Sequence, residues 1–122
     1  MNANPYKAYK QQSVMTMTPG QVLLAVYDEM IKQINIAKLG FEDNNLPLIN
    51  NSLQKSQTIL RELQNTLNFD YEVSGGLNDL YDFFHSVLRE VNIKKSPERL
   101  DEVLQMVVEL RDAFSQAEKQ TR

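Results

Sequence analysis

The chain has 122 residues, a length that suits one domain with a single hydrophobic core. It has no cysteine, which excludes disulfides and thiolate zinc sites and fits a cytosolic protein. Its net charge of -3 gives no general attraction to nucleic acid or anionic lipid, and its longest apolar run, VLLAV, is too short for membrane insertion.

Residues 1–17 are predicted to form an extended apolar cap rather than a regular element. The segment shows no sustained helical or strand period, although it is rich in large side chains. These are Tyr6, Tyr9, Val14, Met15 and Met17. We expect the cap to fold back over an apolar flank of the following helices. It is either a fixed strap or a removable cover over a binding groove.

Four segments carry apolar residues at spacings of three and four, which place these side chains on one face of a helix. The predicted helices lie near 18–42, 45–68, 75–94 and 97–118. Short connections between long helices imply antiparallel neighbours. The sequence therefore predicts an all-α fold, an up-down four-helix bundle over residues 18–118, with residues 119–122 frayed.

Local signals support these boundaries. Thr18-Pro19-Gly20-Gln21 has the form of a capping box with proline at the first helical position. Ser96-Pro97-Glu98 resembles it and predicts the start of the fourth helix. Ser74 is predicted to cap the third helix, and the sequence EDNN at 42–45 predicts a short turn.

Apolar residues outnumber the positions that four packed helices need. Met106 and Val108 lie outside the main apolar stripe of their helix, Tyr81 widens the stripe of the third helix, and Leu80 belongs to that stripe. Such residues either broaden a packed face or line surface grooves for an amphipathic partner segment. The sequence does not separate the two interpretations, because core and groove residues share one spacing.

Catalytic chemistry is not predicted. No phosphate-binding loop, dinucleotide fingerprint or zinc spacing occurs, and no cofactor or metal is expected. The single histidine, His85, opens one alternative, because small four-helix bundles with a surface histidine act as phosphotransfer domains in bacterial signalling. The chain continues after His85 with Ser86-Val87-Leu88-Arg89, without the Lys-Gly pair usual in that class.

Several motifs in order resemble one known family. They are Tyr6 and Tyr9, the cap Thr18-Pro19, the triplet Val26-Tyr27-Asp28, and the blocks LYDFFHSVLREVNIKKS and LDEVLQMVVELRDAF. Over residues 4–116 the chain is similar to the flagellin-specific export chaperones, the FliS family. It departs where His85-Ser86-Val87 replaces the family's frequent Tyr-Arg-Arg and where Phe114 replaces a common tryptophan.

This resemblance implies a function without catalysis. Such chaperones bind the disordered C-terminal segment of flagellin in the bacterial cytosol, prevent premature polymerisation and deliver the subunit to the flagellar type III export gate. The predicted partner-binding residues are Tyr6, Tyr9, Tyr27, Leu80, Tyr81, Met106 and Val108. Tyr6 and Tyr9 are implied in handover at the gate. The alternative function left open is a helical signalling or adaptor module, such as a histidine phosphotransfer domain. A weak homodimer through the same apolar flanks is also left open.

Overall fold

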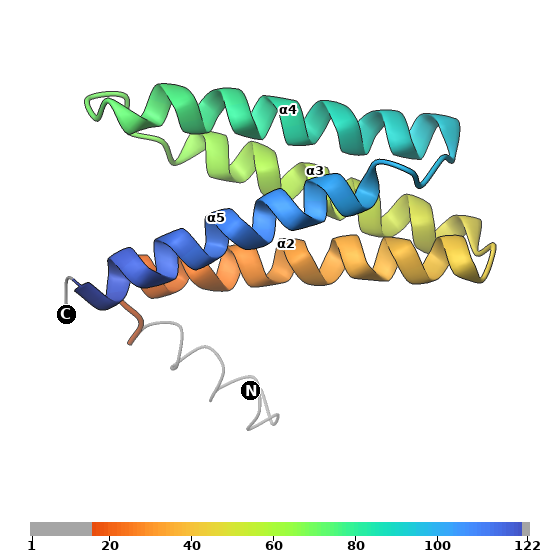
Figure 1. The fold of residues 1–122 in the computed structure, drawn as a ribbon, viewed down its shortest axis with the longest axis horizontal. Coiled ribbons are helices and arrows are strands. Elements are labelled where there is room, and N and C mark those ends of the chain that lie inside the picture. The colour runs from red at the N-terminus through yellow and green to blue at the C-terminus, as the bar shows by residue number, and fades with distance from the viewer. Residues whose placement is uncertain (1–15, 121–122) are drawn as a thin grey trace, which may run out of the picture.

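The computed structural model describes residues 16–120, which form four α-helices joined by short connections. The helices are α2 (Pro19–Glu42), α3 (Leu46–Asn65), α4 (Val73–Lys94) and α5 (Leu100–Gln120). Each runs opposite to the one before it, so the chain traverses the bundle four times (Figure 1). This confirms the predicted all-α up-down bundle. The predicted cap lies almost wholly outside the described residues.

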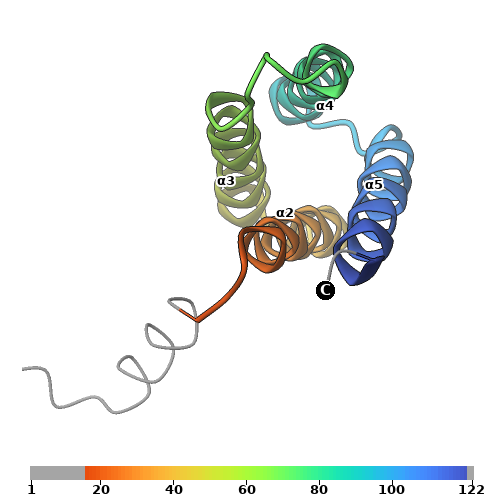
Figure 2. The same cartoon turned by 90° about the vertical axis from the view of Figure 1, so that its left-hand side faces the viewer.

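Viewed from one end, the helices stand at the corners of a ring in the order α2, α3, α4, α5 (Figure 2). Three sides of this ring are closely packed, namely α2 on α3, α3 on α4 and α2 on α5. The fourth side, between α4 and α5, packs much less closely. In Figure 1 these two helices meet near the connection between them and diverge toward the opposite end.

The start of α2 follows the predicted capping box. The Thr18 side chain accepts a hydrogen bond from the Gln21 backbone amide at 3.1 Å, and the Gln21 side chain accepts one from the Thr18 amide at 3.0 Å. The backbone amides of Thr18 and Gln21, which would otherwise lack a partner at the helix start, are thereby satisfied. At the other end of α2, Asn45 caps α3 by accepting from the Leu48 amide at 3.1 Å, which confirms the predicted turn.

Four predicted boundaries were wrong by two or three residues, and one of them is the end of α5, which extends to Gln120 rather than 118. Helix α3 ends at Asn65, before 68. Helix α4 begins at Val73, so Ser74 lies inside it, and its hydroxyl donates to the Asn68 carbonyl at 2.6 Å instead of capping. Helix α5 begins at Leu100, because Pro97 and the next two residues form a turn that ends in a Leu100 amide to Pro97 carbonyl bond.

The core is a single cluster to which every helix contributes. Its largest side chains with less than 2% exposure include Tyr27, Met30, Leu53, Leu60 and Phe84. Helices α2 and α3 approach closely at Gly40, where an added Cβ would lie 2.9 Å from Ile49 Cγ1 and 3.1 Å from the Ile49 amide nitrogen. Gly40 therefore allows α3 to lie directly against α2.

Candidate functional site

An apolar hollow lies at the end of the bundle where α2 begins and α5 ends. Pro19, Gly20 and Leu23 line it from α2, and Phe114 and Ala117 line it from α5. Its volume is about 480 Å³, and only Thr18 and Glu118 add polar side chains to its lining. The hollow lies at the end where α4 has diverged from α5, as Figure 2 shows, and within residues 16–120 its lining comes only from α2, α5 and Thr18.

A second hollow of equal volume, about 480 Å³, lies between α2 and α3, but its chemistry is different. Of its lining residues only Ile59 is apolar. The others are Glu29, Gln33, Asn51, Gln54, Lys55, Thr58 and Glu62. Such a surface remains well solvated, and covering it with an apolar segment would cost the hydration of its polar groups. Chemistry rather than size therefore singles out the hollow between α2 and α5.

The α4 side of the open seam carries an apolar stripe. Val73, Gly76, Leu80 and Phe83 recur at spacings of three and four, which aligns them along one flank of α4. This flank faces α5, because the Arg99 guanidinium just before α5 lies over the Phe83 ring at 5.7 Å from its centroid. Phe83 is nevertheless 36% exposed and Val73 64% exposed, so the stripe is only partly covered.

The α5 side of the seam carries a matching stripe. Asp101 and Arg111 bind side chains of α2, while Val103 and Val107 lie in the core. The remaining inward flank, which the helical period directs toward α4, holds side chains that are apolar and at most half-buried. They are Met106, Leu110, Ala113, Phe114 and Ala117. The two stripes therefore form an apolar seam, which we call the α4–α5 seam, that leads into the end hollow.

The four predicted groove residues do not form one site. Leu80 and Met106 lie on the two sides of the seam and are half-buried. Val108 is also half-buried but lies on the other flank of α5, because residues two apart on a helix point about 200° apart. Tyr81 does not line a groove in this structure, since it is 2% exposed and belongs to the core.

Tyr27, predicted to contact a partner, is likewise buried, with no exposed surface. Its hydroxyl lies 2.5 Å from the Tyr81 hydroxyl, so the two form a hydrogen bond between α2 and α4 through the core. Burial raises the pKa of both phenols above the usual value, most strongly for Tyr27. Apolar surroundings disfavour the phenolate, so both hydroxyls stay protonated and keep the bond intact.

The sequence interpretation missed three residues that line the end hollow, and two of its predicted residues cannot be placed. Leu23, Phe114 and Ala117 line the hollow, but the predicted partner-binding residues do not include them. Their spacing matches a core stripe, and only the divergence of α4 exposes them. Tyr6 and Tyr9 lie outside the described residues and stay predictions.

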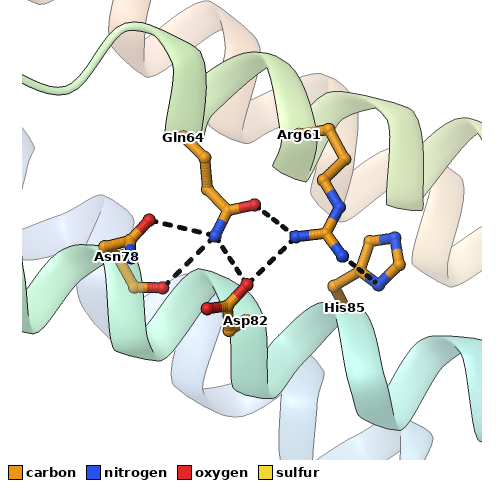
Figure 3. A network of polar contacts seen from close by, with 5 residues as sticks. All are labelled: Arg61, Gln64, Asn78, Asp82 and His85. Atoms are coloured by element: carbon orange, nitrogen blue, oxygen red, sulfur yellow. Dashed lines mark hydrogen bonds and ion pairs between the residues drawn. The ribbon is translucent and has the colours of Figure 1, made fainter.

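His85 belongs to a polar network between α3 and α4 (Figure 3). The Arg61 guanidinium donates to Asp82 at 3.0 Å and to Gln64 at 2.6 Å, and it lies 3.3 Å from His85 Nδ1. Gln64 in turn donates to Asp82 and Asn78. Burial and the nearby Arg61 and Arg89 charges lower the pKa of His85. These contacts give His85 a place in helix packing, and the phosphotransfer alternative draws no support from them.

Two further features bear on the kind of site present. Within residues 16–120, no group of three or more histidine, aspartate and glutamate side chains could hold a metal ion. No described helix has a stretch long and apolar enough to span a bilayer. The fold and the seam together define a class of protein, the helical bundle with an apolar hollow that its own described helices leave uncovered.

Comparison with known proteins gives this class a family. Residues 2–121 match the family described as "Flagellar protein FliS". A flagellar secretion chaperone FliS of Bacillus subtilis is 40% identical over 114 residues, covering 93% of this chain and 86% of that protein. One of Vibrio cholerae is 25% identical over 116 residues, covering 90% and 85%.

A solved structure agrees in fold. The crystal structure of a bacterial flagellar chaperone superposes with a TM-score of 0.80 at 21% identity and covers 94% of this chain and 95% of its own. The chain therefore belongs to the FliS family of flagellar secretion chaperones, as its motifs predicted.

Proposed function

We propose that this chaperone acts in the bacterial cytosol on flagellin, binding its disordered C-terminal segment, preventing premature polymerisation and delivering the subunit to the flagellar type III export gate. The observation that carries the proposal is the α4–α5 seam, whose apolar stripes lead into the uncovered hollow lined by Leu23 and Phe114. An amphipathic segment has the apolar face that such a surface would cover.

The energetics favour an extended surface over a single pocket. Ordering ~30 residues of a disordered segment costs roughly 45 kcal/mol at ~1.5 kcal/mol for each residue. At ~25 cal/mol for each Å² of buried apolar surface, offsetting this cost takes on the order of 1,800 Å². A seam along two helices of 22 and 21 residues, extended by the end hollow, offers the length that such wrapping requires.

The direct test is calorimetric titration with the last ~40 residues of flagellin. Phe83→Ser should weaken binding by roughly tenfold, because the exposed Phe83 ring lies on the seam and its loss removes ~1–2 kcal/mol of apolar burial. Ile93→Ser is the matched control, since Ile93 is a 68% exposed apolar residue of the same helix outside the seam stripe. Equal losses in both variants, or no binding to the unmodified chain, would refute the proposal.

The N-terminal cap contributes in a separate way that the same titration can measure. In the proposed function, Tyr6 and Tyr9 serve handover rather than the fold, so deleting residues 1–15 should change tail affinity while the bundle still melts cooperatively. Loss of cooperative melting in that truncation would instead support the fixed strap.

A further inference from the structure

The dipeptide Tyr-Asp occurs at the same level of the bundle on two parallel helices. Tyr27 and Asp28 lie on α2, and Tyr81 and Asp82 lie on α4. Both tyrosines point into the core and share the 2.5 Å hydrogen bond between their hydroxyls. Both aspartates point outward, and each meets an arginine of a neighbouring helix. We call these residues and the two arginines the Tyr-Asp layer.

The layer connects all four helices. The Tyr27–Tyr81 bond joins α2 to α4 across the ring. Asp28 accepts from the Arg111 guanidinium at 2.9 Å and 3.3 Å, which joins α2 to α5. Asp82 accepts from Arg61 at 3.0 Å, which joins α4 to α3 as Figure 3 shows. Gly40 already lets α2 and α3 pack directly.

Among the described residues, the layer leaves two sides of the ring unlinked: the closely packed side between α2 and α3, and the loosely packed side between α4 and α5. Within residues 16–120, the layer contains no hydrogen bond or ion pair between α4 and α5, and these helices also pack least closely. Between α4 and α5, the two apolar stripes of the seam face each other. Apolar contacts are non-directional, so they tolerate sliding and separation that a bidentate ion pair would resist.

We propose that the Tyr-Asp layer is a positioning device that confines the motion of the bundle to the α4–α5 seam, with the Tyr27–Tyr81 bond setting the width of the opening. The bond anchors α4 to α2 through the core. Asp28 and Arg111 anchor α5 to the same helix from the other side. The seam can therefore widen to admit an amphipathic helical segment while the other three sides stay closed.

The device also reaches the end hollow. The Tyr27 ring lies 5.6 Å from the Phe114 ring, centroid to centroid, and Phe114 lines the hollow. A segment that packs on Phe114 therefore rests on a side chain that contacts the α2 member of the bond. Through this contact with Phe114, Tyr27 and Tyr81 would affect partner binding although both are buried. They position the surface and do not touch the partner.

The test separates the bond from the cost of an unpaired hydroxyl. Tyr81→Phe or Tyr27→Phe alone leaves one buried hydroxyl without a partner and should lower the melting temperature. The double variant Tyr27→Phe/Tyr81→Phe keeps both rings, leaves no orphaned group and should melt close to the unmodified chain. Any change in seam geometry in the double variant then reports the lost link.

Seam width can be measured with spin labels, since the chain has no native cysteine. Exposed positions Asp79 on α4 and Gln116 on α5, each changed to cysteine, report on the seam. Exposed Glu29 and Thr58, changed likewise, report on the closed side between α2 and α3 as the matched control. Pulsed dipolar spectroscopy gives the distance distribution of each pair with and without the flagellin tail.

We expect a broader distribution for the seam pair than for the control pair, and further broadening of the seam pair alone in the double variant. Tail binding should shift the seam pair by roughly 2 Å or more, the size of ordinary shifts between packed helices. The double variant should bind the tail roughly 3- to 10-fold more weakly, because the preformed opening is lost.

This inference rests on the proposed function for its binding step but not for its structural step. A double variant whose seam distribution stays as narrow as in the unmodified chain overturns it, as does a tail-induced shift in the control pair instead of the seam pair. If the tail fails to bind the unmodified chain, the proposed function fails, and the distributions of the free chain still decide the inference.

Discussion

The two hairpins of the bundle, α2–α3 and α4–α5, use similar helices and reach opposite results. In the first, Gly40 brings α3 against α2, and hydrophobic side chains such as Ile34 and Leu53 are fully buried. In the second, the helices diverge, and Phe83, Met106 and Leu110 stay partly exposed. Apolar content alone therefore does not close an interface, because the backbones must also be able to approach.

The largest expected effect comes from truncating a core leucine, and a seam leucine serves as its comparison. Leu53→Ala, at a fully buried position of α3, should lower the free energy of unfolding by ~2–4 kcal/mol, the range for a cavity in a packed core. Leu110→Ala, at a half-buried seam position, should lower it by only ~1 kcal/mol. Urea denaturation measures both values.

Tail affinity should rank these variants in the reverse order. Leu110→Ala is expected to weaken binding of the flagellin tail, whereas Leu53→Ala should leave it unchanged well below its melting temperature. Equal stability losses would contradict the contrast drawn between the two hairpins.

The closed hairpin should be sensitive to a single methyl group. In Gly40→Ala the new Cβ would lie 3.1 Å from a backbone atom of Ile49, so one helix must shift, and we expect a net loss of ~1–2 kcal/mol. Gly75→Ala is the control, because nothing lies within 4 Å of a Cβ added at this position. The better helix propensity of alanine should raise the free energy of unfolding by ~0.5–1 kcal/mol. Thermal melting of the two variants should move in opposite directions.

Alkaline pH tests the link that joins the two hairpins. The pKa values of Tyr27 and Tyr81 are raised in the folded state, so the fold holds their protons more tightly than the unfolded chain does. Their contribution is complete below the unfolded pKa of ~10 and is lost as pH rises above it, for Tyr27 by about 1 kcal/mol between pH 10 and 11.

The reference for this measurement is Tyr27→Phe/Tyr81→Phe, which lacks both phenols and should lose less stability over the same range. Chemical denaturation at stepped pH gives the comparison. Parallel losses in both proteins would show that other groups control alkaline unfolding.

The smallest effect is expected for the ion pair that holds α5 to α2. Arg111→Gln removes the pair with Asp28, whose side chains are 30% and 54% exposed, and should cost ~0.5 kcal/mol or less. The difference should shrink further when salt is raised to 1 M. A loss above ~2 kcal/mol, or one that salt leaves unchanged, would mean that Arg111 contributes mainly by packing.

Local sequence signals predicted most of this fold, and long-range geometry explains the rest. The capping box at Thr18 and the turn capped by Asn45 act over three or four residues, so the sequence shows them directly. The exposure of Leu23 and Phe114 depends instead on the angle at which α4 and α5 diverge. No spacing within one helix encodes that angle, which is why core and seam positions could not be separated.

The predicted partner-binding residues on the helices also divide between the seam and the core. Leu80 and Met106 face the seam, whereas Tyr27 and Tyr81 form a hydrogen bond inside the core. An aromatic residue on an apolar stripe is compatible with either place. Only the structure shows that the hydroxyls of the two tyrosines, 54 positions apart, form a hydrogen bond with each other.

The Tyr-Asp dipeptides of α2 and α4 give the two hairpins a common reference position. Gly40 lies 13 residues after Tyr27, and the residue 13 after Tyr81 is Lys94. At matching registers, one hairpin therefore has the smallest side chain and the other has one of the longest. At this register the two hairpins therefore differ in kind: the Gly40 backbone packs against the neighbouring helix, whereas the Lys94 side chain pairs with Glu90 of its own helix.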